Sequence, residues 1–253
     1  MNFSSSSEIL SKVKGINGLT AMSDRILESK SECPALVSTL NLQHLRLCSE
    51  SEIFFSIYRD SELIIPDGLP IIWLSNFNGI RNLKRFPGVD LCLKILKSEE
   101  KVFVLGCRIE TVNIVEKRFD IDSSKISGFY GLCPNDPSEN LLEEIAGLIN
   151  NFDPKFIILA LGSPKQEYYY SFLKSRFTPS KLVFVGLGGS IDILSGKFSR
   201  APAIFQRAGL EWAWRLSQSP RRLLPRYVRD GYFLIKFLYY LVRMRNPWEN
   251  REY

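Results

Sequence analysis

The sequence has very little histidine, and its cysteines show no metal-binding spacing. His44 is the only histidine, which argues against a histidine-based metal site and against a Ser-His-Asp triad. The cysteines are odd in number and lack any CxxC pair: Cys33, Cys48, Cys92, Cys107 and Cys133. A disulfide framework or a zinc cluster is therefore disfavoured, and reduced cysteines in the cytoplasm are the simpler prediction.

A signal peptide and a membrane-spanning run are also missing from the pattern. The opening "MNFSSSSEIL" lacks a cationic start and a continuous apolar segment. The longest apolar stretch near the other end, "YFLIKFLYYLV", is too short to span a bilayer and is interrupted by Lys236. We therefore expect a cytoplasmic protein.

What is present fits one large domain, or one domain with an appendage. The chain has 253 residues, of which 45% are hydrophobic and 24% charged, enough for a substantial core. The net charge of +6 is unevenly placed: residues 200–253 carry 11 Lys and Arg against 4 Asp and Glu. The basic character thus belongs to the C-terminal part.

Short apolar runs alternate with amphipathic segments over the first 200 residues. Strands are predicted at 35–41, 62–66, 101–106, 125–131, 155–162 and 181–186. Helices are predicted around 42–58, 68–78, 89–98, 110–119, 138–151 and 164–175. This alternation predicts an α/β fold with a mostly parallel sheet and helices on both faces. In such folds, the loops after the strands form the ligand crevice.

Residues 200–253 show no strand pattern and are rich in arginine and aromatic residues. We predict helices broken at Pro220, Pro225 and Gly231. An aromatic-aliphatic helix flanked by arginines suits the interface of an anionic membrane. The alternative is a terminal helix packed on the core, with its arginines solvated.

Asp67 ends an apolar run within "SELIIPDGLP". Pro-Asp-Gly is a favoured turn, so turn chemistry alone accounts for the residue. Its place after a buried strand also allows a general base at the mouth of a site.

Two later segments combine a strand end with a glycine-containing helix start. In "LALGSPKQEYYY", Pro164 is expected to start a helix whose first turn carries Gln166, and "VGLGGSIDILSGK" places Asp192 after a glycine-rich turn. Each is ordinary helix-start chemistry. Together at one sheet edge, they suggest an anionic or sugar-bearing ligand.

Polar residues follow two further predicted elements. In "STLN", Thr39 and Asn41 are two residues apart at a strand end, so both side chains point to the same face. The alternative is an ordinary polar strand terminus. In "RFPGVDL", Asp90 is expected to cap a helix, and Arg85 is either a solvated charge or an anion ligand.

Three familiar signatures fail. "GLGG" (186–189) lacks the third glycine of a dinucleotide fingerprint, and "GK" (196–197) lacks the rest of a P-loop. "DID" (120–122) resembles the DxD that holds a metal on nucleotide sugars, but it is expected to close a helix.

Taken together, these segments resemble the WecG/TagA/CpsF glycosyltransferase family. The matching segments run in family order from about residue 17 to about 235. They are "STLN", "IIPDGLPIIW", "RFPGVDL", "FVLGCRIETVNIVEKRF", "LALGSPKQE" and "VGLGGSIDILSGKFSRAPAIFQRAGLEWAWRLSQSPRRLLPRY". "GSPKQE" and the last block are the most specific.

The resemblance implies a Rossmann-like catalytic core (1–199) without a DxD metal site and a basic helical appendage (200–253) that contacts the membrane and completes the active site. It implies an inverting, metal-independent hexosyltransferase with no cofactor. This enzyme moves N-acetylmannosamine, its uronic acid or a related hexose from a UDP-sugar to a polyprenyl-diphosphate-linked saccharide. The resemblance places this reaction in cell-surface polysaccharide or teichoic-acid synthesis and the enzyme at the inner face of the plasma membrane.

By position, the resemblance makes Asp67 the catalytic base. It also assigns substrate-binding residues: Thr39, Asn41, Arg85, Gln166, Asp192, Arg215, Arg221, Arg222 and Arg226. Which arginines contact a diphosphate is left open. "GFYGLCPND" departs from the family pattern after the fourth strand, so the sugar is not specified.

The partners implied are the UDP-sugar, the lipid-linked acceptor and an anionic membrane, without nucleic acid, and a homo-oligomer stays open. A different class is a non-catalytic module that binds nucleic acid or membrane through the basic tail, since that tail attracts phosphate backbones. An inactive transferase acting as a scaffold is a third hypothesis.

Overall fold

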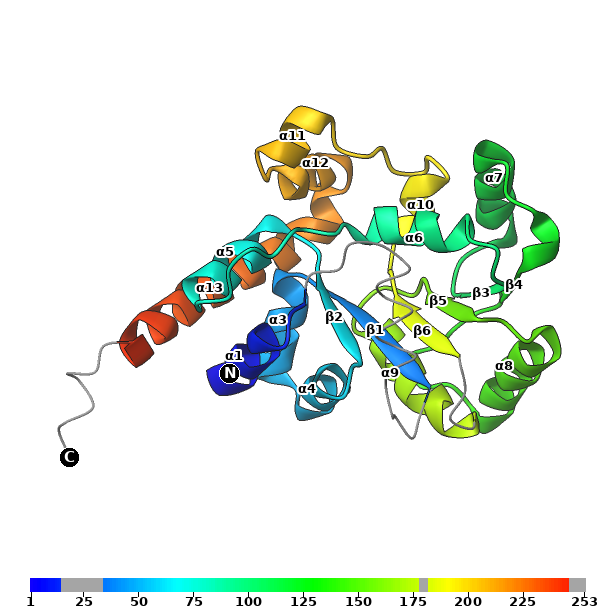
Figure 1. The fold of residues 1–253 in the computed structure, drawn as a ribbon, viewed down its shortest axis with the longest axis horizontal. Coiled ribbons are helices and arrows are strands. Elements are labelled where there is room, and N and C mark those ends of the chain that lie inside the picture. Colours follow the sequence, from blue (N-terminus) through cyan, green and yellow to red (C-terminus); the bar gives the residue numbers. More distant parts are fainter. Residues whose placement is uncertain (15–33, 178–181, 246–253) are drawn as a thin grey trace.

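A six-stranded, wholly parallel sheet forms the centre of the protein (Figure 1). The computed structural model describes residues 1–14, 34–177 and 182–245. The strand order is β2-β1-β6-β5-β3-β4. The strands are β1 (Ala35–Leu40), β2 (Leu63–Pro66), β3 (Val102–Leu105), β4 (Ile126–Phe129), β5 (Phe156–Leu159) and β6 (Val183–Gly186). The predicted α/β class and all six predicted strands are confirmed. Three parts of the predictions lie outside the described residues: Cys33, the first residues of the family resemblance and the last residues of the predicted appendage.

Helices cover both faces of the sheet. α6, α7 and α10 pack on one face, and α4, α8 and α9 pack on the other (Figure 1). The helices before residue 200 are α1 (Phe3–Ser11), α3 (Leu42–Glu50), α4 (Glu52–Arg59), α5 (Leu69–Phe77), α6 (Gly88–Leu96), α7 (Ile109–Phe119), α8 (Glu139–Phe152), α9 (Lys165–Leu173) and α10 (Ser190–Leu194), with 3-10 turns η1 (Ser123–Lys125) and η2 (Lys174–Arg176). The later helices are α11 (Ala203–Arg207), α12 (Glu211–Gln218) and α13 (Pro220–Arg245).

The strands read as continuous apolar runs because neither face of the sheet meets water. In β1, Ala35 and Val37 point into one apolar cluster while Leu36 points into the other. In β3, Val104 and Leu105 divide in the same way. Alternate side chains of each strand therefore bury opposite layers.

The predicted helix at 42–58 is two helices instead of one. Ser51 leaves the helical conformation and accepts a hydrogen bond on its side chain from the Phe54 backbone N–H. Ser51 is thus the C-terminal cap of α3 and the N-terminal cap of α4, because a serine side chain readily accepts from the unpaired backbone N–H groups at a helix start. α1 was not predicted, whereas α10 follows the helix start expected in "VGLGGSIDILSGK".

α13 is one continuous helix of 26 residues, so the predicted breaks at Pro225 and Gly231 are wrong. Pro220 is its first residue. Proline removes one helical hydrogen bond, and glycine costs about 1 kcal/mol relative to alanine. Packing offsets these costs: Phe233 and Phe237 are fully buried and stack at 5.4 Å between ring centroids.

The buried face of α13 belongs to a third apolar cluster beside the β2 edge of the sheet. This cluster also takes side chains from α1, α3, α4 and α5, and Figure 1 shows α13 running beside α3 and α5. The packed-helix alternative therefore holds for one face of α13. None of the helices in the described ranges combines the length and apolar character that crossing a bilayer demands. The division of the chain at residue 200 stays a prediction.

The shared cluster makes α13 a structural part of the fold. Phe237→Ala should lower the free energy of unfolding by about 3–5 kcal/mol, because it leaves a cavity among fully buried rings. Tyr239→Ala, on the exposed face of the same helix, should change it by less than about 0.5 kcal/mol. Urea unfolding of both variants checks this. Equal, small effects would mean that α13 does not pack on the core.

Candidate functional site

The carboxyl ends of four neighbouring strands meet at a cavity of about 360 Å³. The register aligns Leu40 of β1 with Pro66 of β2, and Gly186 of β6 with both Ser38 of β1 and Leu159 of β5. The residues that follow these strands are thereby brought together. Eight of the ten predicted site residues line this cavity: Thr39, Asn41, Asp67, Gln166, Asp192, Arg215, Arg222 and Arg226.

A second cavity of about 400 Å³ adjoins the first, and its walls are more apolar. Leu69, Trp73, Trp212 and Leu234 contribute to it, together with Arg85. Residues that line both cavities mark their junction: Asn41, Gln43, Asp67, Arg215, Arg226 and Tyr227.

Asp67 stands at this junction directly after β2. Its backbone N–H donates to the Leu40 carbonyl at 2.8 Å, which continues the β1–β2 pairing by one residue. Gly68 follows with φ +138°, a conformation that favours glycine, and caps α5. The backbone N–H of Gly88 donates to Oδ1 of Asp67 at 3.4 Å. Asp67 and Gly68 thus form the two-residue connection between β2 and α5, and the Gly88 contact orients the carboxylate.

Burial raises the pKa of the Asp67 carboxyl, and the positive charges of Arg215 and then Arg85 partly oppose the rise. Arg85 lines the second cavity and forms an ion pair with Glu211 of α12. The carboxylate is thus influenced by the charge of an arginine from the core and of one from the C-terminal helices. Such an environment suits a proton acceptor.

Gln166 is buried with both ends of its amide engaged. Oε1 accepts from the Gly188 backbone N–H at 2.9 Å, and Nε2 donates to Oε1 of Glu167 at 2.9 Å. A Cβ on Gly186 would lie 3.0 Å from that Nε2, so any larger residue there would push the Gln166 amide aside. The predicted helix start is shifted by one residue: Pro164 is the N-cap, and Lys165 is the first helical residue.

Thr39 and Asn41 line the cavity while also serving the fold. The Thr39 hydroxyl donates to the Gly186 carbonyl at 3.0 Å, joining β1 to β6. The Asn41 side chain accepts from the His44 backbone N–H and caps α3. Burial lowers the pKa of His44 to about 3, so its imidazole is neutral near pH 7.

The remaining predicted residues separate into cavity and surface positions. Asp192, in the first turn of α10, pairs with Lys197 at 3.1 Å. Arg222 lies over the ring of Phe198, 5.3 Å from its centroid. Arg221 is exposed and lines neither cavity, so the structure does not bring it to this site.

The acidic pair of "DID" lies at helix ends, as expected. Asp120 ends α7 in the left-handed conformation, and Asp122 caps η1. Within the described ranges, no group of three or more His, Cys, Asp or Glu side chains could hold a metal ion. Asp90, predicted as a cap, instead lies in the first turn of α6 behind Pro87 and pairs with Arg200 at 2.7 Å.

Comparison with known proteins identifies the family. The model of the "Glycosyl transferase WecG/TagA/CpsF family" matches residues 11–247. The chain belongs to this family.

Three relatives of this glycosyltransferase share one description, "N-acetylglucosaminyldiphosphoundecaprenol N-acetyl-beta-D-mannosaminyltransferase". The protein from Bacillus subtilis (strain 168) is 28% identical over 74% of this chain and 73% of its own length. That from Bacillus spizizenii is 32% identical over 68% and 69%, and that from Staphylococcus aureus (strain MW2) is 26% identical over 74% and 73%.

Glu167 is a buried carboxyl of this glycosyltransferase that sequence reasoning missed. Burial raises its pKa to about 7, and Oε2 is buried with no hydrogen-bond partner among the described residues. The signal in the sequence is an acid between Gln166 and three tyrosines, "KQEYYY". Trp73, Trp212 and Tyr227 were also missed, since an aromatic side chain looks the same in a core as in a cavity wall.

The raised pKa of Glu167 predicts a pH dependence of stability. The folded state binds a proton up to about pH 7, whereas an unperturbed glutamate releases it near 4.5. Glu167 therefore stabilises the folded state fully below pH 4.5. Its contribution to the free energy of unfolding falls by roughly 3 kcal/mol as the pH rises to 7. In Glu167→Gln, chemical unfolding at several pH values should lack this decline. An identical decline in both proteins would show that Glu167 is ionised when folded.

Proposed function

We propose that the protein is an inverting, metal-independent glycosyltransferase that moves N-acetylmannosamine from a UDP-sugar to polyprenyl-diphosphate-linked N-acetylglucosamine. The uronic acid of N-acetylmannosamine, or a related hexose, is the alternative sugar of the donor. The observation that carries the proposal is the junction of a polar and an apolar cavity at Asp67, flanked by arginines. The names of three relatives, each about 70% covered by this chain, support the acceptor and the sugar.

The first cavity is the proposed donor site. Two glycine-rich strand ends allow a diphosphate close approach, and Arg222 and Arg226 offer planar guanidinium forks that suit it. Gln166 and Asp192 offer an amide and a carboxylate that can bind sugar hydroxyls. Cations beside the diphosphate would also stabilise the UDP that leaves.

The second cavity is the proposed acceptor site. Leu69, Trp73, Trp212 and Leu234 provide apolar walls for the first isoprene units. Arg85 and Arg215 can neutralise the acceptor diphosphate near the junction. The acceptor sugar would then face the donor sugar across Asp67.

Asp67 would take the proton of the acceptor hydroxyl as that oxygen attacks the anomeric carbon. The bond from that carbon to the UDP oxygen breaks on the opposite face, so the configuration inverts. A carboxyl with a raised pKa is a stronger base than an ordinary aspartate. The arginines on both sides still favour its ionised form before reaction.

Removing this base should slow the reaction and leave the fold intact. Asp67→Asn should lower kcat by roughly 10²–10⁴-fold, the usual contribution of a positioned base. The wild-type rate should fall as the pH drops through the raised pKa of Asp67, and this acid limb should vanish in the variant. UDP release with a short-chain lipid-linked acceptor measures both.

Asp60→Asn is the matched control, because Asp60 is an exposed aspartate in a surface pair with Arg59. It should keep wild-type kinetics. Near-normal activity of Asp67→Asn would contradict the base assignment. No UDP release by the wild type would favour an inactive scaffold.

We place the enzyme on the inner face of the plasma membrane, held by the outer face of α13. Large apolar side chains recur there every three or four residues and are exposed: Leu224, Val228, Tyr232, Ile235, Tyr239 and Val242. Arg221, Arg229 and Lys236 are basic residues along the same helix. An apolar stripe with basic flanks suits an anionic bilayer surface.

Ile235→Asp tests this placement. It should weaken flotation with anionic vesicles by about 10-fold or more, since burying one isoleucine contributes roughly 1.5–3 kcal/mol. The thermal midpoint should stay unchanged, because Ile235 is 71% exposed. A short DNA duplex in the same assay should not compete. Effective competition would favour the nucleic-acid module.

A further inference from the structure

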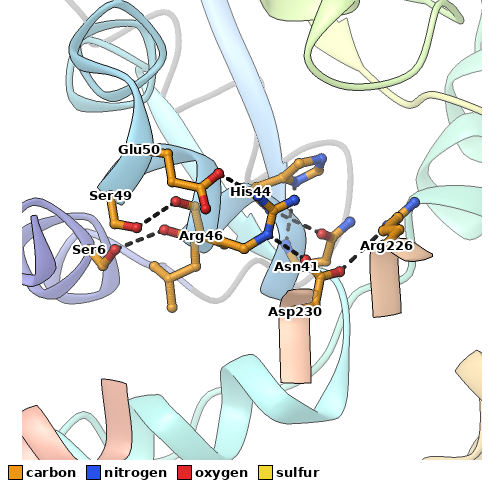
Figure 2. A network of polar contacts seen from close by, with 9 residues as sticks. Ser6, Asn41, His44, Arg46, Ser49, Glu50, Arg226 and Asp230 are labelled. Atoms are coloured by element: carbon orange, nitrogen blue, oxygen red, sulfur yellow. Dashed lines mark hydrogen bonds and ion pairs between the residues drawn. The ribbon is translucent and has the colours of Figure 1, made fainter. Parts of the chain in front are cut away.

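A buried ion network joins α13 to α3 (Figure 2). Nε of Arg46, on α3, donates to Oδ1 of Asp230, on α13, at 2.8 Å. Both side chains are only 6% exposed. Oδ2 of Asp230 faces Nε of Arg226 at 3.5 Å, one turn earlier on α13. Arg46 also pairs with Glu50, on the side away from Arg226 in Figure 2.

Stability alone is a weak reason for such a network. Removing two charges from water is costly, and well-packed apolar residues often stabilise as well or better. The contact between α3 and α13 already has an apolar cluster that includes Leu45, Phe233 and Phe237. What the ions add is direction: Asp230 accepts a hydrogen bond from Arg46 and attracts the Arg226 guanidinium, whose buried Nε has no hydrogen-bond partner among the described residues.

The network ends at the junction of the cavities. Arg226 lines both cavities, as does Arg215, and the positive charge of Arg215 acts on Arg226. Asp230 lines the second cavity but not the first, which is the proposed UDP site. Two guanidinium groups so placed repel each other. Within the described residues, Asp230 is the carboxylate at ion-pair distance from Arg226, so it offsets this repulsion. At the other end, α3 begins after Asn41, which also lines both cavities.

We propose that Asp230 is a positioning residue that acts through Arg226. The Asp230 carboxylate is anchored by Arg46 and holds the Arg226 guanidinium at the cavity junction. The packing of α13 against α3 therefore also places Arg226 in the diphosphate site. This rests on the proposed function only in taking Arg226 as a diphosphate ligand.

A double-mutant cycle with UDP as the probe tests the coupling. Calorimetry would give the UDP affinity of the wild type, Asp230→Asn, Arg226→Gln and the double variant. Each single variant should bind about 10- to 100-fold more weakly, the usual range for a lost charge-assisted hydrogen bond. The double variant should match Arg226→Gln, because Asp230 then has nothing left to position.

Glu50→Gln is the control, since it changes the other carboxylate on Arg46 and lines neither cavity. It should keep the wild-type UDP affinity. Additive losses in the double variant, or an equal loss in Glu50→Gln, would overturn the proposal. If Asp230→Asn does not fold, Arg46→Lys replaces it: its loss of affinity should likewise disappear in the Arg226→Gln background, and persistence there would refute the coupling.

The same proteins separate this proposal from the proposed function. A coupled loss of UDP affinity without sugar transfer by the wild type would sustain the role of Asp230 and defeat the transferase assignment. Normal transfer by the wild type with additive affinities would do the reverse.

Discussion

The parallel register of the six strands is the constraint on which the site depends. All six strands run in one direction, so every strand ends at the same edge of the sheet. Thr39, Asp67, Gln166 and Asp192 are far apart in the chain and become neighbours only because of this register. Burial on both faces leaves that edge as the place where polar side chains can meet a ligand.

The C-terminal helices supply further residues of the two cavities at the edge of the sheet. Arg215 and Arg226 reach both cavities, while the buried face of α13 shares an apolar cluster with α1 and α3. The outer face of α13 carries the exposed apolar stripe. One helix therefore has a core face, a cavity arginine and the proposed membrane face, so the proposed substrate binding and the proposed location share one element.

Local patterns predicted the parts of the fold that local physics controls. All six strands were found because continuous apolar runs with polar loops have few other solutions. The breaks at Pro225 and Gly231 were wrong because tertiary packing of Phe233 and Phe237 overrides local propensity. Eight predicted site residues line one cavity, but Arg221 does not, since helix phase decided which arginines face it. The Arg46–Asp230 pair was not predicted, because 184 residues separate its members.

The central claim is that a sugar passes between two cavities across Asp67 with inversion. The most direct test is the anomeric configuration of the product, read by nuclear magnetic resonance. The wild type would be given α-configured UDP-N-acetylmannosamine and a short-chain polyprenyl-diphosphate-linked N-acetylglucosamine. A β-linked disaccharide on the lipid is the predicted product. An α-linked disaccharide, or free N-acetylmannosamine with no disaccharide, would contradict the account.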